Sequence, residues 1–543
     1  MTTVCSPNQF KPWGDSLGAD KGEGGQMSLA SAASGTEPVL DNAAQPLRHS
    51  TTKAALTSGG GEIIARGLTV VLSIVTARVL EPREVGVLGL GVIFMSVVSM
   101  VGYYPETAAV TAKGNAADAV YALLATLLRA VLIGALMLAI LFAYPVLSSL
   151  VVGGEQYSGD LKSLLLVLIW VPAFEMLSSY PQIMLQRRLQ LAFLARVQFL
   201  QPVVFVSLAV GLLVTGSGYL GVAWASVASS ALTTLLVWQR IWRLSGVSWN
   251  GLRSRLALRE TLVGSGRVFA GGFGGYLGER VDNLLVAGVL GPAPMSFYAM
   301  AWNASRTPAN VFARAVTFVL VPTLARIHED QARVQRALRE CLRHAYLLLV
   351  PACAALFVTA PLLVSFVLGP KWLPVAPCLR VMCVTVLVAP FLYVSGALLV
   401  GTGRAHLSAI GTVAHLAILG ILVPILARRW GIVGAAYADM AATVVLTGAL
   451  IATAQVATRQ LSRSSAATVM LPMAAGVFAG TLAWGVRSFI AQDLLCLICQ
   501  LGMIMAAYPL TILLLGGRSR LLDLTTLLGS VLRRRVLAAE ANG

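Results

Sequence analysis

The sequence predicts an all-α, polytopic membrane protein of about fourteen transmembrane helices, in which two parallel six-helix bundles surround a central cavity and two additional helices follow. Three observations predict this fold: the apolar composition, the number of long hydrophobic runs and an internal repeat. The 543 residues are 57% hydrophobic and 12% charged, whereas soluble domains are about 45–50% apolar and about 25% charged. A bilayer accommodates this much apolar surface, and a soluble core does not.

Hydrophobic runs of about 20 residues are long enough to cross a bilayer. They lie at residues 59–80, 85–112, 119–150, 161–181, 194–214, 219–239, 262–290, 294–322, 344–368, 376–400, 405–427, 431–455, 467–490 and 494–516. Lys and Arg concentrate in the loops on one side of these runs, which predicts that both termini are cytoplasmic. The net charge of +17 therefore reflects topology and does not indicate nucleic-acid binding.

The repeat relates the two halves of the chain. "ARVLEPREVGVLGLG" (77–91) matches "AGVLGPAPMSFYAMA" (287–301), and "GYLGVAWAS" (218–226) matches "GIVGAAYAD" (431–439), at offsets of about 210 and about 213 residues. Two matches at nearly one offset indicate duplication of a six-helix unit. Because six is an even number, the two copies share one orientation in the membrane.

These patterns predict five regions: a disordered cytoplasmic tail (1–55), two six-helix bundles (56–245 and 256–458), two additional transmembrane helices (465–517) and a basic cytoplasmic tail (518–543). The longest outward loop is expected around residues 151–160. A loop of that length leaves no room for a catalytic domain outside the membrane.

No metal or cofactor is expected. Cys496 and Cys499 form a CxxC motif, but both lie in an apolar run without a second pair or a histidine at ligand spacing, so helix packing is favoured over a metal or redox site. A nucleotide-binding interpretation of "GSGRVFAGG" (264–272) fails because no strand precedes it.

Polar side chains recur at helical spacing in two of the apolar runs. In the first run they are Glu62, Arg66, Thr69, Ser73 and Thr76, and in the eighth run they are Asn303, Arg306, Thr307, Asn310, Arg314 and Thr317. Each set occupies one face of its helix. Lipid cannot solvate such a face, so both stripes are expected to line a cavity or to pack on each other.

The seventh run contains the densest cluster of charges. Glu279, Asp282 and Asn283 share one face, Arg280 points about 100° away from Glu279, and Arg267 lies near the cytoplasmic end. Arg129, Glu175 and Asp439 are further charges at membrane depth, and each is interpreted as part of a structural ion pair, as a snorkelling end group or as functional. His406 and His415 are interpreted as a loop residue and a packing residue.

The predicted cavity is cationic. Its substrate-binding candidates are Arg66, Arg129, Arg267, Arg280, Asn303, Arg306, Asn310 and Arg314, and its gating or ion-coupling candidates are Glu62, Glu279, Asp282 and Asn283. Guanidinium groups match phosphate oxygens in geometry and charge, so an anionic substrate is favoured.

Three segments carry a resemblance to a known family: "TARVLEPREVGVLGLGVIF" (76–94), 280–330 with its Asp-Asn and "PTLAR" motifs, and "VLGPKWLPVAPCLRVM" (367–382). They resemble the Wzx-type polysaccharide-repeat-unit flippases of the multidrug/oligosaccharidyl-lipid/polysaccharide exporter superfamily. The resemblance implies a bacterial inner-membrane protein that moves polyprenyl-pyrophosphate-linked oligosaccharide to the periplasmic leaflet. It further implies alternating access, no cofactor other than a coupling ion (H⁺ or Na⁺), and partners such as a polysaccharide polymerase.

Two alternative functions are considered. A multidrug or metabolite antiporter of the same superfamily would need an acidic cavity for cationic drugs, and here arginines outnumber carboxylates. A membrane-embedded polymerase or glycosyltransferase would need catalytic groups on a large outer loop or a cytosolic nucleotide-sugar site, and the sequence contains neither.

Overall fold

The computed structural model describes residues 67–111, 126–131, 133–135, 137–138, 154–188, 190–244, 280–327, 329–458, 464–488, 490 and 492–516. All of them belong to one contact unit, Ala54–Gly543. Apart from short turns these residues are helical, and no strand occurs among them. The all-α prediction is confirmed for this part of the chain.

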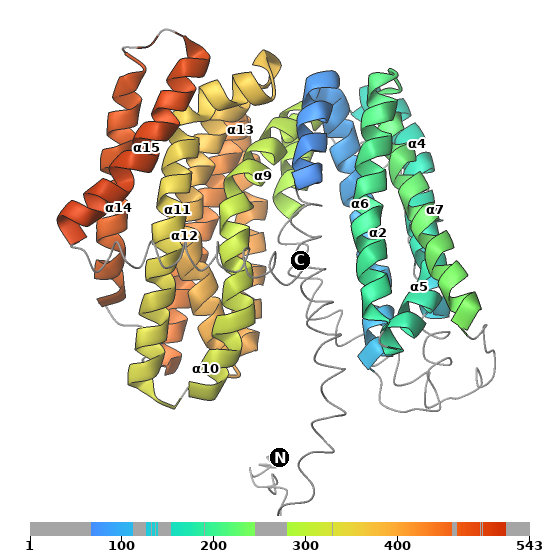
Figure 1. Ribbon diagram of the computed structural model, residues 1–543, viewed down its shortest axis with the longest axis horizontal. Coiled ribbons are helices and arrows are strands. Elements are labelled where there is room, and N and C mark those ends of the chain that lie inside the picture. The colour runs from blue at the N-terminus through green and yellow to red at the C-terminus, as the bar shows by residue number, and fades with distance from the viewer. Residues whose placement is uncertain are drawn as a thin grey trace, which may run out of the picture. The chain divides into compact units, whose positions relative to one another are not determined.

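The helices follow one another with short connections (Figure 1). In chain order they are Gly67–Val79, α2 (Pro82–Thr111), Thr126–Ala135, α4 (Gly154–Leu168), α5 (Trp170–Arg187), α6 (Leu191–Val214), α7 (Gly218–Leu244), 280–290, α9 (Pro292–Ala315), the π-helical η1 (Val316–Leu320), α10 (Val321–Ile327), α11 (Gln331–Val367), the 3₁₀-helical η2 (Pro370–Trp372), α12 (Val375–Gly401), α13 (Ala405–Thr458), α14 (Ser464–Val486) and α15 (Asp493–Gly516).

Eight of the described helices are long and apolar enough to cross a membrane. The predicted runs are helical wherever the structure describes them. The total of fourteen transmembrane helices stays a prediction. The 54-residue α13 is two helices in physical terms, because Trp430 (φ −124°) and Gly431 (φ 61°) leave the helical region. This break separates the predicted runs 405–427 and 431–455.

The connection expected around residues 151–160 is helical from Gly154 onward, where α4 begins, and its outward position stays a prediction. Hydropathy does not detect this extension because its polar residues need no contact with lipid. Asp160 anchors it: its carboxylate accepts hydrogen bonds from Arg83 Nη2 at 3.4 Å and from the Tyr219 hydroxyl at 3.3 Å. The predicted tails and the connection around 245–255 lie outside the described residues.

The structure repeats the conformations that the internal repeat predicts. Gly218 (φ 59°) and Gly431 (φ 61°) occupy matching positions, each at the start of a helix and each in the left-handed region that favours glycine. Pro82 and Pro292 are likewise matched, since each opens the helix after the turn. The duplication therefore preserves the backbone at both matched segments.

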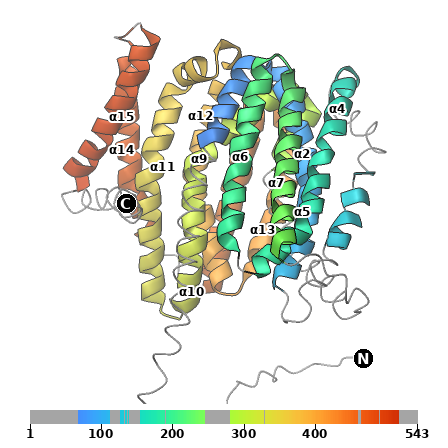
Figure 2. The same cartoon turned by 45° about the vertical axis from the view of Figure 1, so that its right-hand side comes forward.

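Each half packs mainly within itself. In the N-terminal half (67–244) α7 contacts α5 and α6, and in the C-terminal half (280–458) α12 contacts α9, α11 and α13. The added helices α14 and α15 pack on each other and on α11, as Figures 1 and 2 both show.

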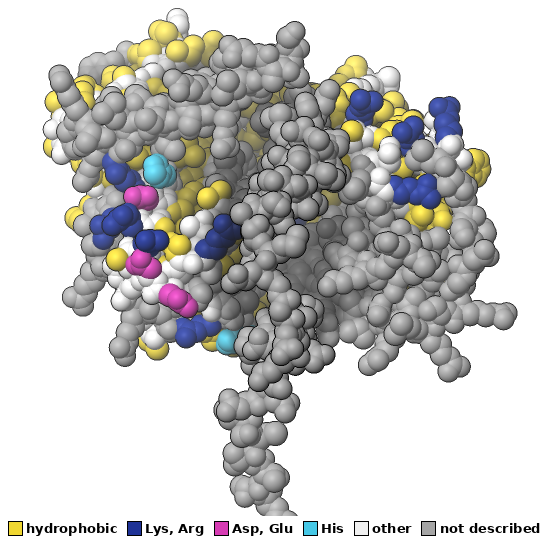
Figure 3. Space-filling model, turned by 60° about the horizontal axis from the view of Figure 1, so that its bottom comes forward, with side chains coloured by type: hydrophobic (Ala, Val, Ile, Leu, Met, Phe, Trp, Pro, Cys, Tyr) yellow, Lys and Arg dark blue, Asp and Glu magenta, His cyan; other side chains and the backbone are white. Residues whose placement is uncertain are grey.

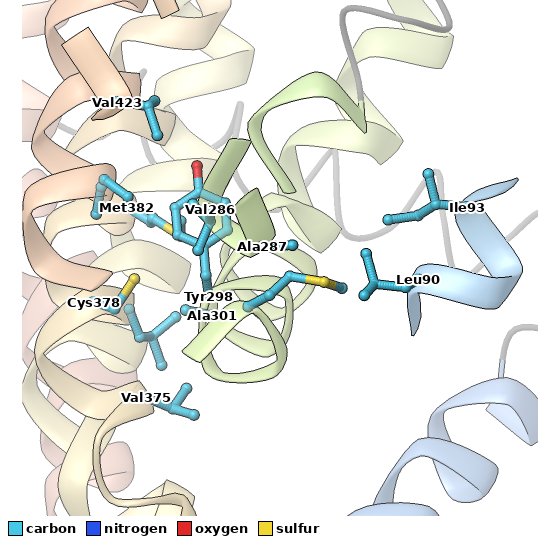
Figure 4. Close-up of a cluster of buried hydrophobic side chains, with 14 of the residues drawn as sticks. Leu90, Ile93, Val286, Ala287, Tyr298, Ala301, Val375, Cys378, Met382 and Val423 are labelled. Atoms are coloured by element: carbon cyan, nitrogen blue, oxygen red, sulfur yellow. The ribbon is translucent and has the colours of Figure 1, made fainter. Parts of the chain in front are cut away.

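The halves contact each other where α2 packs on α9. Gly86 permits this approach, because a Cβ at that position would overlap the carbonyl of Pro292. A buried core spans the contact (Figure 4), with Leu90 and Ile93 from α2, Tyr298 from α9 and Met382 from α12.

We predict that Gly434→Ala destabilises the protein. A Cβ at Gly434 would overlap the backbone carbonyl of Leu426 across the break in α13, and backbone cannot give way as a side chain does. Overpacking of this kind costs about 1–3 kcal/mol. The measurement is the apparent melting temperature of the detergent-solubilised protein.

Gly420→Ala is the matched control in α13, because nothing lies within 4 Å of a Cβ there. Replacing a helical glycine by alanine should leave stability unchanged or raise it by up to about 1 kcal/mol. Equal melting temperatures for the two variants would contradict the packing described at the break.

Candidate functional site

A tight turn positions the first candidate residues. The helix of residues 280–290 ends at Gly291, whose φ of 94° favours glycine, and the Gly291 N–H donates to the carbonyl of Ala287 at 2.9 Å. Pro292 then begins α9, where its missing N–H costs nothing. The turn folds the helix that carries Asp282 back against α9.

Asp282 is held by hydrogen bonds to both of its carboxylate oxygens. Oδ2 accepts from the Tyr298 hydroxyl at 3.1 Å, and Oδ1 accepts from the backbone N–H of Asn283 at 2.8 Å and from its Nδ2 at 3.2 Å. Asp282 and Asn283 are each 2% exposed, and Tyr298 is fully buried. The amide oxygen of Asn283 is buried without a hydrogen-bond partner among the described residues.

Arg306 and Asp439 form an ion pair between α9 and the second part of α13. Nη2 of Arg306 donates to Oδ1 of Asp439 at 3.3 Å and to Oδ2 at 3.2 Å. The Asp439 side chain is 4% exposed and the Arg306 side chain 20% exposed. Trp302, one helical turn earlier, places its ring 5.0 Å from the guanidinium carbon, which adds a cation–π contact.

Asp282, Tyr298, Arg306 and Asp439 form one charged cluster, because Asp282 lies within electrostatic reach of both Arg306 and Asp439. When both carboxylates are ionised, the cluster holds two negative charges against one positive charge. At membrane depth an uncompensated charge is costly. Asp282 and Asp439 thus share the guanidinium of Arg306.

The N-terminal half contains a second ion pair, between Arg129 and Glu175 of α5. Arg129 Nη2 lies 3.6 Å from Glu175 Oε2, and Nη1 donates to Ser179 Oγ at 3.0 Å. Arg129 is 6% exposed. Of the interpretations that the sequence left for Glu175, the ion pair is present, and it also holds the predicted substrate residue Arg129.

The other predicted residues are distributed as follows. Asn303 and Asn310 are exposed on α9, with Thr307 between them, and Arg280 is half-buried in the helix of residues 280–290. Arg314 belongs to α9, but its side chain lies outside the described residues, as do Glu62, Arg66, Arg267 and Glu279. The polar stripes thus stay predictions for the first helix and agree with an exposed polar face for α9.

A second set of contacts joins the two halves through residues of the segments "ARVLEP" (77–82) and "GPKW" (369–372). Arg78 Nε donates to the carbonyl of Val367 at 2.9 Å, and its Nη2 donates to the carbonyl of Phe366. Both carbonyls belong to the last turn of α11, where backbone acceptors lack helical partners and the helix dipole is negative. A cation from one half thus caps a helix of the other.

Lys371 makes the reciprocal contact. Its Nζ donates to the carbonyl of Leu80 at 2.6 Å and to that of Arg78 at 3.1 Å, at the end of the first helix. Beside it, Trp372 is fully buried and its Nε1–H donates to the carbonyl of Ala77 at 2.8 Å. Arg78, Lys371 and Trp372 together form a contact between the two halves that we call the latch.

The sequence patterns do not predict the latch, although all three of its residues lie in the segments that carry the family resemblance. The same patterns leave the role of Asp439 open and predict a packing role for His415. In the structure His415 lies within electrostatic reach of Asp439 and Arg306. No spacing pattern predicts that contact, because it joins two parts of α13 across the break at Gly431.

Comparison with solved structures agrees with this fold. The chain superposes on a lipid II flippase MurJ in an inward closed conformation with a TM-score of 0.70, covering 84% of this chain and 98% of that chain at 13% identity. An inward-facing multidrug-resistance MATE family transporter of the MOP superfamily gives a TM-score of 0.56, covering 75% and 100% of the two chains at 17% identity.

Two curated relatives match a shorter segment. Over 133 residues the chain is 28% identical to the lipopolysaccharide biosynthesis protein WzxC of Escherichia coli (strain K12) and 27% identical to an uncharacterized membrane protein in the cps region of Klebsiella pneumoniae. Each match covers 24% of this chain and 27% of the relative.

The family model described as polysaccharide biosynthesis protein matches residues 75–377, which is more than half of the chain and includes Asp282, Arg306 and the whole latch. The expected family resemblance is confirmed. The chain is a multi-pass membrane protein that belongs to the polysaccharide biosynthesis protein family.

Proposed function

We propose that this protein flips polyprenyl-pyrophosphate-linked oligosaccharide repeat units across the bacterial inner membrane for the synthesis of exopolysaccharide, capsule or O-antigen. It acts as a transporter by alternating access and not as an enzyme. The observation that carries the proposal is the family match over 75–377, the region that contains both Arg306 and the latch. The fold shared with a lipid II flippase supports it.

The pyrophosphate is the part of this cargo that the charged cluster suits. Because Nη2 of Arg306 makes both contacts to Asp439 and the side chain is 20% exposed, the guanidinium can bind a phosphate oxygen without leaving Asp439. The exposed amides Asn303 and Asn310 on the same face supply hydrogen bonds for sugar hydroxyls. The polyprenyl tail stays in lipid.

Asp282, the carboxylate of the cluster that is not paired with Arg306, is the proposed site at which an ion is coupled to transport. Asp282 and the partnerless amide oxygen of Asn283 are hard oxygen ligands, which suit Na⁺, and a carboxylate also suits H⁺. Entry of either ion compensates the second negative charge beside Arg306. Ion binding and cargo binding thus act on one set of side chains, which is the requirement for coupling them.

Alternating access requires the latch to open. With the N-terminus in the cytoplasm, the ends of the first helix and of α11 lie at the periplasmic side, so the latch closes the outer end. Its contacts are hydrogen bonds to helix ends, which re-form with water at modest net cost. Opening must also withdraw Trp372 from the buried core that the two halves share.

Deletion of the gene tests the proposal directly. A strain without this flippase should accumulate lipid-linked oligosaccharide on the cytoplasmic leaflet and lose surface polysaccharide. The measurement is the fraction of lipid-linked sugar that a membrane-impermeant oxidant or glycosidase reaches in right-side-out and inverted vesicles. Normal periplasmic turnover of the lipid-linked sugar would refute the flippase, and accumulation on the periplasmic leaflet would indicate the polymerase alternative.

Arg306→Ala should abolish polysaccharide export at normal membrane levels. The change leaves Asp439 buried without its partner, a loss that costs about 3–5 kcal/mol in comparable pairs. The measurement is surface polysaccharide in a complemented deletion strain, normalised to protein in the membrane. Arg333→Gln is the control, because Arg333 forms an exposed pair with Asp330 and its side chain is 72% exposed.

The neutral double variant Arg306→Met/Asp439→Leu separates a structural role from a functional one. Apolar side chains of similar volume can replace a buried pair without loss of stability. We expect a protein that folds and does not export. Export at the parental level from this variant would show that the pair is only structural.

Lys371→Met should shift the protein toward the outward-open state. The change removes the cation from the end of the first helix, so the outer end opens more often. The measurement is the rate at which a membrane-impermeant maleimide labels Thr69→Cys in intact cells, in a background lacking the seven native cysteines. Labelling should accelerate several-fold, whereas Lys162→Met, which removes an exposed cation of α4, should leave the rate unchanged.

A further inference from the structure

The start of α11 carries a group of charges that the transport site does not use. At 1.5 Å per residue its 37 residues measure about 55 Å, against about 30 Å for the hydrocarbon core. Its first turns therefore extend beyond the hydrocarbon into the headgroup region. Figure 3 shows this end of the molecule, where Lys and Arg side chains gather beside acidic and His side chains.

Three arginines of these turns line one cavity of about 280 Å³. Arg336, Arg339 and Arg343 lie at i, i+3 and i+7, a spacing that places them on one face of the helix. Glu340 is the acidic residue of the lining. The rim of the cavity thus carries three guanidinium groups against one carboxylate.

The floor of the same cavity is apolar and comes from three helices. Leu347 belongs to α11, Leu471 and Pro472 to α14, and Ile512 to α15. Leu347 and Ile512 are part of a buried core. The Tyr508 hydroxyl of α15 donates to the carbonyl of Tyr346 at 3.4 Å, which ties the helices together beside the floor.

The face of α11 that lines this cavity continues toward the bilayer centre and lines a second groove there. Val350, Ala354 and Phe357 continue its helical spacing and line a second groove of about 280 Å³ with Met473 and Val477 of α14. That groove is almost entirely apolar in its lining residues. Along one helix face, a basic rim is thus followed by an apolar floor and then by an apolar groove.

We propose that this basic pocket binds an anionic phospholipid of the cytoplasmic leaflet, such as phosphatidylglycerol. The guanidinium groups match the headgroup phosphate in charge and geometry, and the floor and groove accept the glycerol and an acyl chain. Soluble phosphate would gain nothing from the apolar floor. The assignment to the cytoplasmic leaflet rests on the orientation adopted in the proposed function.

The occupant is a resident lipid and not the cargo, because the pocket faces α14 and α15, the two helices outside the duplicated units. An anionic lipid bound there holds the added helices to α11 through charges on one side and acyl contacts on the other. The basic start of α11 then sits at the membrane surface in a fixed register.

Lipid binding to the purified full-length protein tests the proposal independently of export. Native mass spectrometry compares phosphatidylglycerol with phosphatidylcholine of the same acyl chains and with inorganic phosphate. We expect preferential binding of phosphatidylglycerol, and a loss of about tenfold or more in the triple variant Arg336→Gln/Arg339→Gln/Arg343→Gln, as the removal of charge-assisted contacts predicts.

Two further variants keep the test decisive if the triple variant folds poorly. Glu340→Gln removes the carboxylate of the rim and should strengthen phosphatidylglycerol binding, an effect opposite to that of misfolding. Arg333→Gln removes a charge from the same helix end outside the pocket and should have little effect.

Three results would overturn the proposal. The first is equal binding of phosphatidylglycerol and phosphatidylcholine, and the second is binding of inorganic phosphate as tight as that of the lipid. The third is displacement of phosphatidylglycerol by polyprenyl pyrophosphate at equal concentration, which would identify a cargo site. A deletion strain that turns over its lipid-linked sugar normally would refute the flippase and leave the lipid result unaffected.

Discussion

The structure depends on one constraint: a charge at membrane depth must find its partner inside the protein. The Arg306–Asp439 pair meets this constraint by joining α9 to the second part of α13, two segments far apart in the sequence. Arg129 and Glu175 meet it in the other half. Each pair fixes how its helices face one another, because rotating either helix would expose a guanidinium or a carboxylate to lipid.

The sequence predicted the fold well because the bilayer imposes the same length and polarity on every spanning helix. The runs, the break at Gly431 and the matched Pro82 and Pro292 are all local features that composition and repeats reveal. The extension of α4 before Asp160 was missed because polar residues outside the hydrocarbon leave no hydropathy signal. The sequence therefore predicts which segments are helical where lipid constrains the chain, and it predicts the ends of these helices less well.

The sequence predicted only part of the candidate site. The spacing predicted a polar face with Asp282 and Asn283 on one helix, and a polar face with Asn303, Arg306 and Asn310 on the next. The two asparagines of the second face are exposed on α9. Which arginine meets which carboxylate was not readable, since Asp439 lies more than one hundred residues from Arg306 and no periodicity relates them. The latch was hidden for a related reason: its acceptors are backbone carbonyls, whose availability depends on where two helices end and not on residue type.

The latch and the charged cluster are connected through adjacent residues of α9. Phe297 packs edge-on against Trp372 of the latch with ring centroids 5.5 Å apart, while Tyr298 donates to Asp282. Phe297 is half-buried and Tyr298 is fully buried, so the proposed opening, which moves Trp372, acts on the turn of α9 that holds Asp282. Asp282 would then lose a hydrogen bond at the moment the outer end opens. Because linkage is reciprocal, the proposed coupling ion at Asp282 would in turn bias the latch.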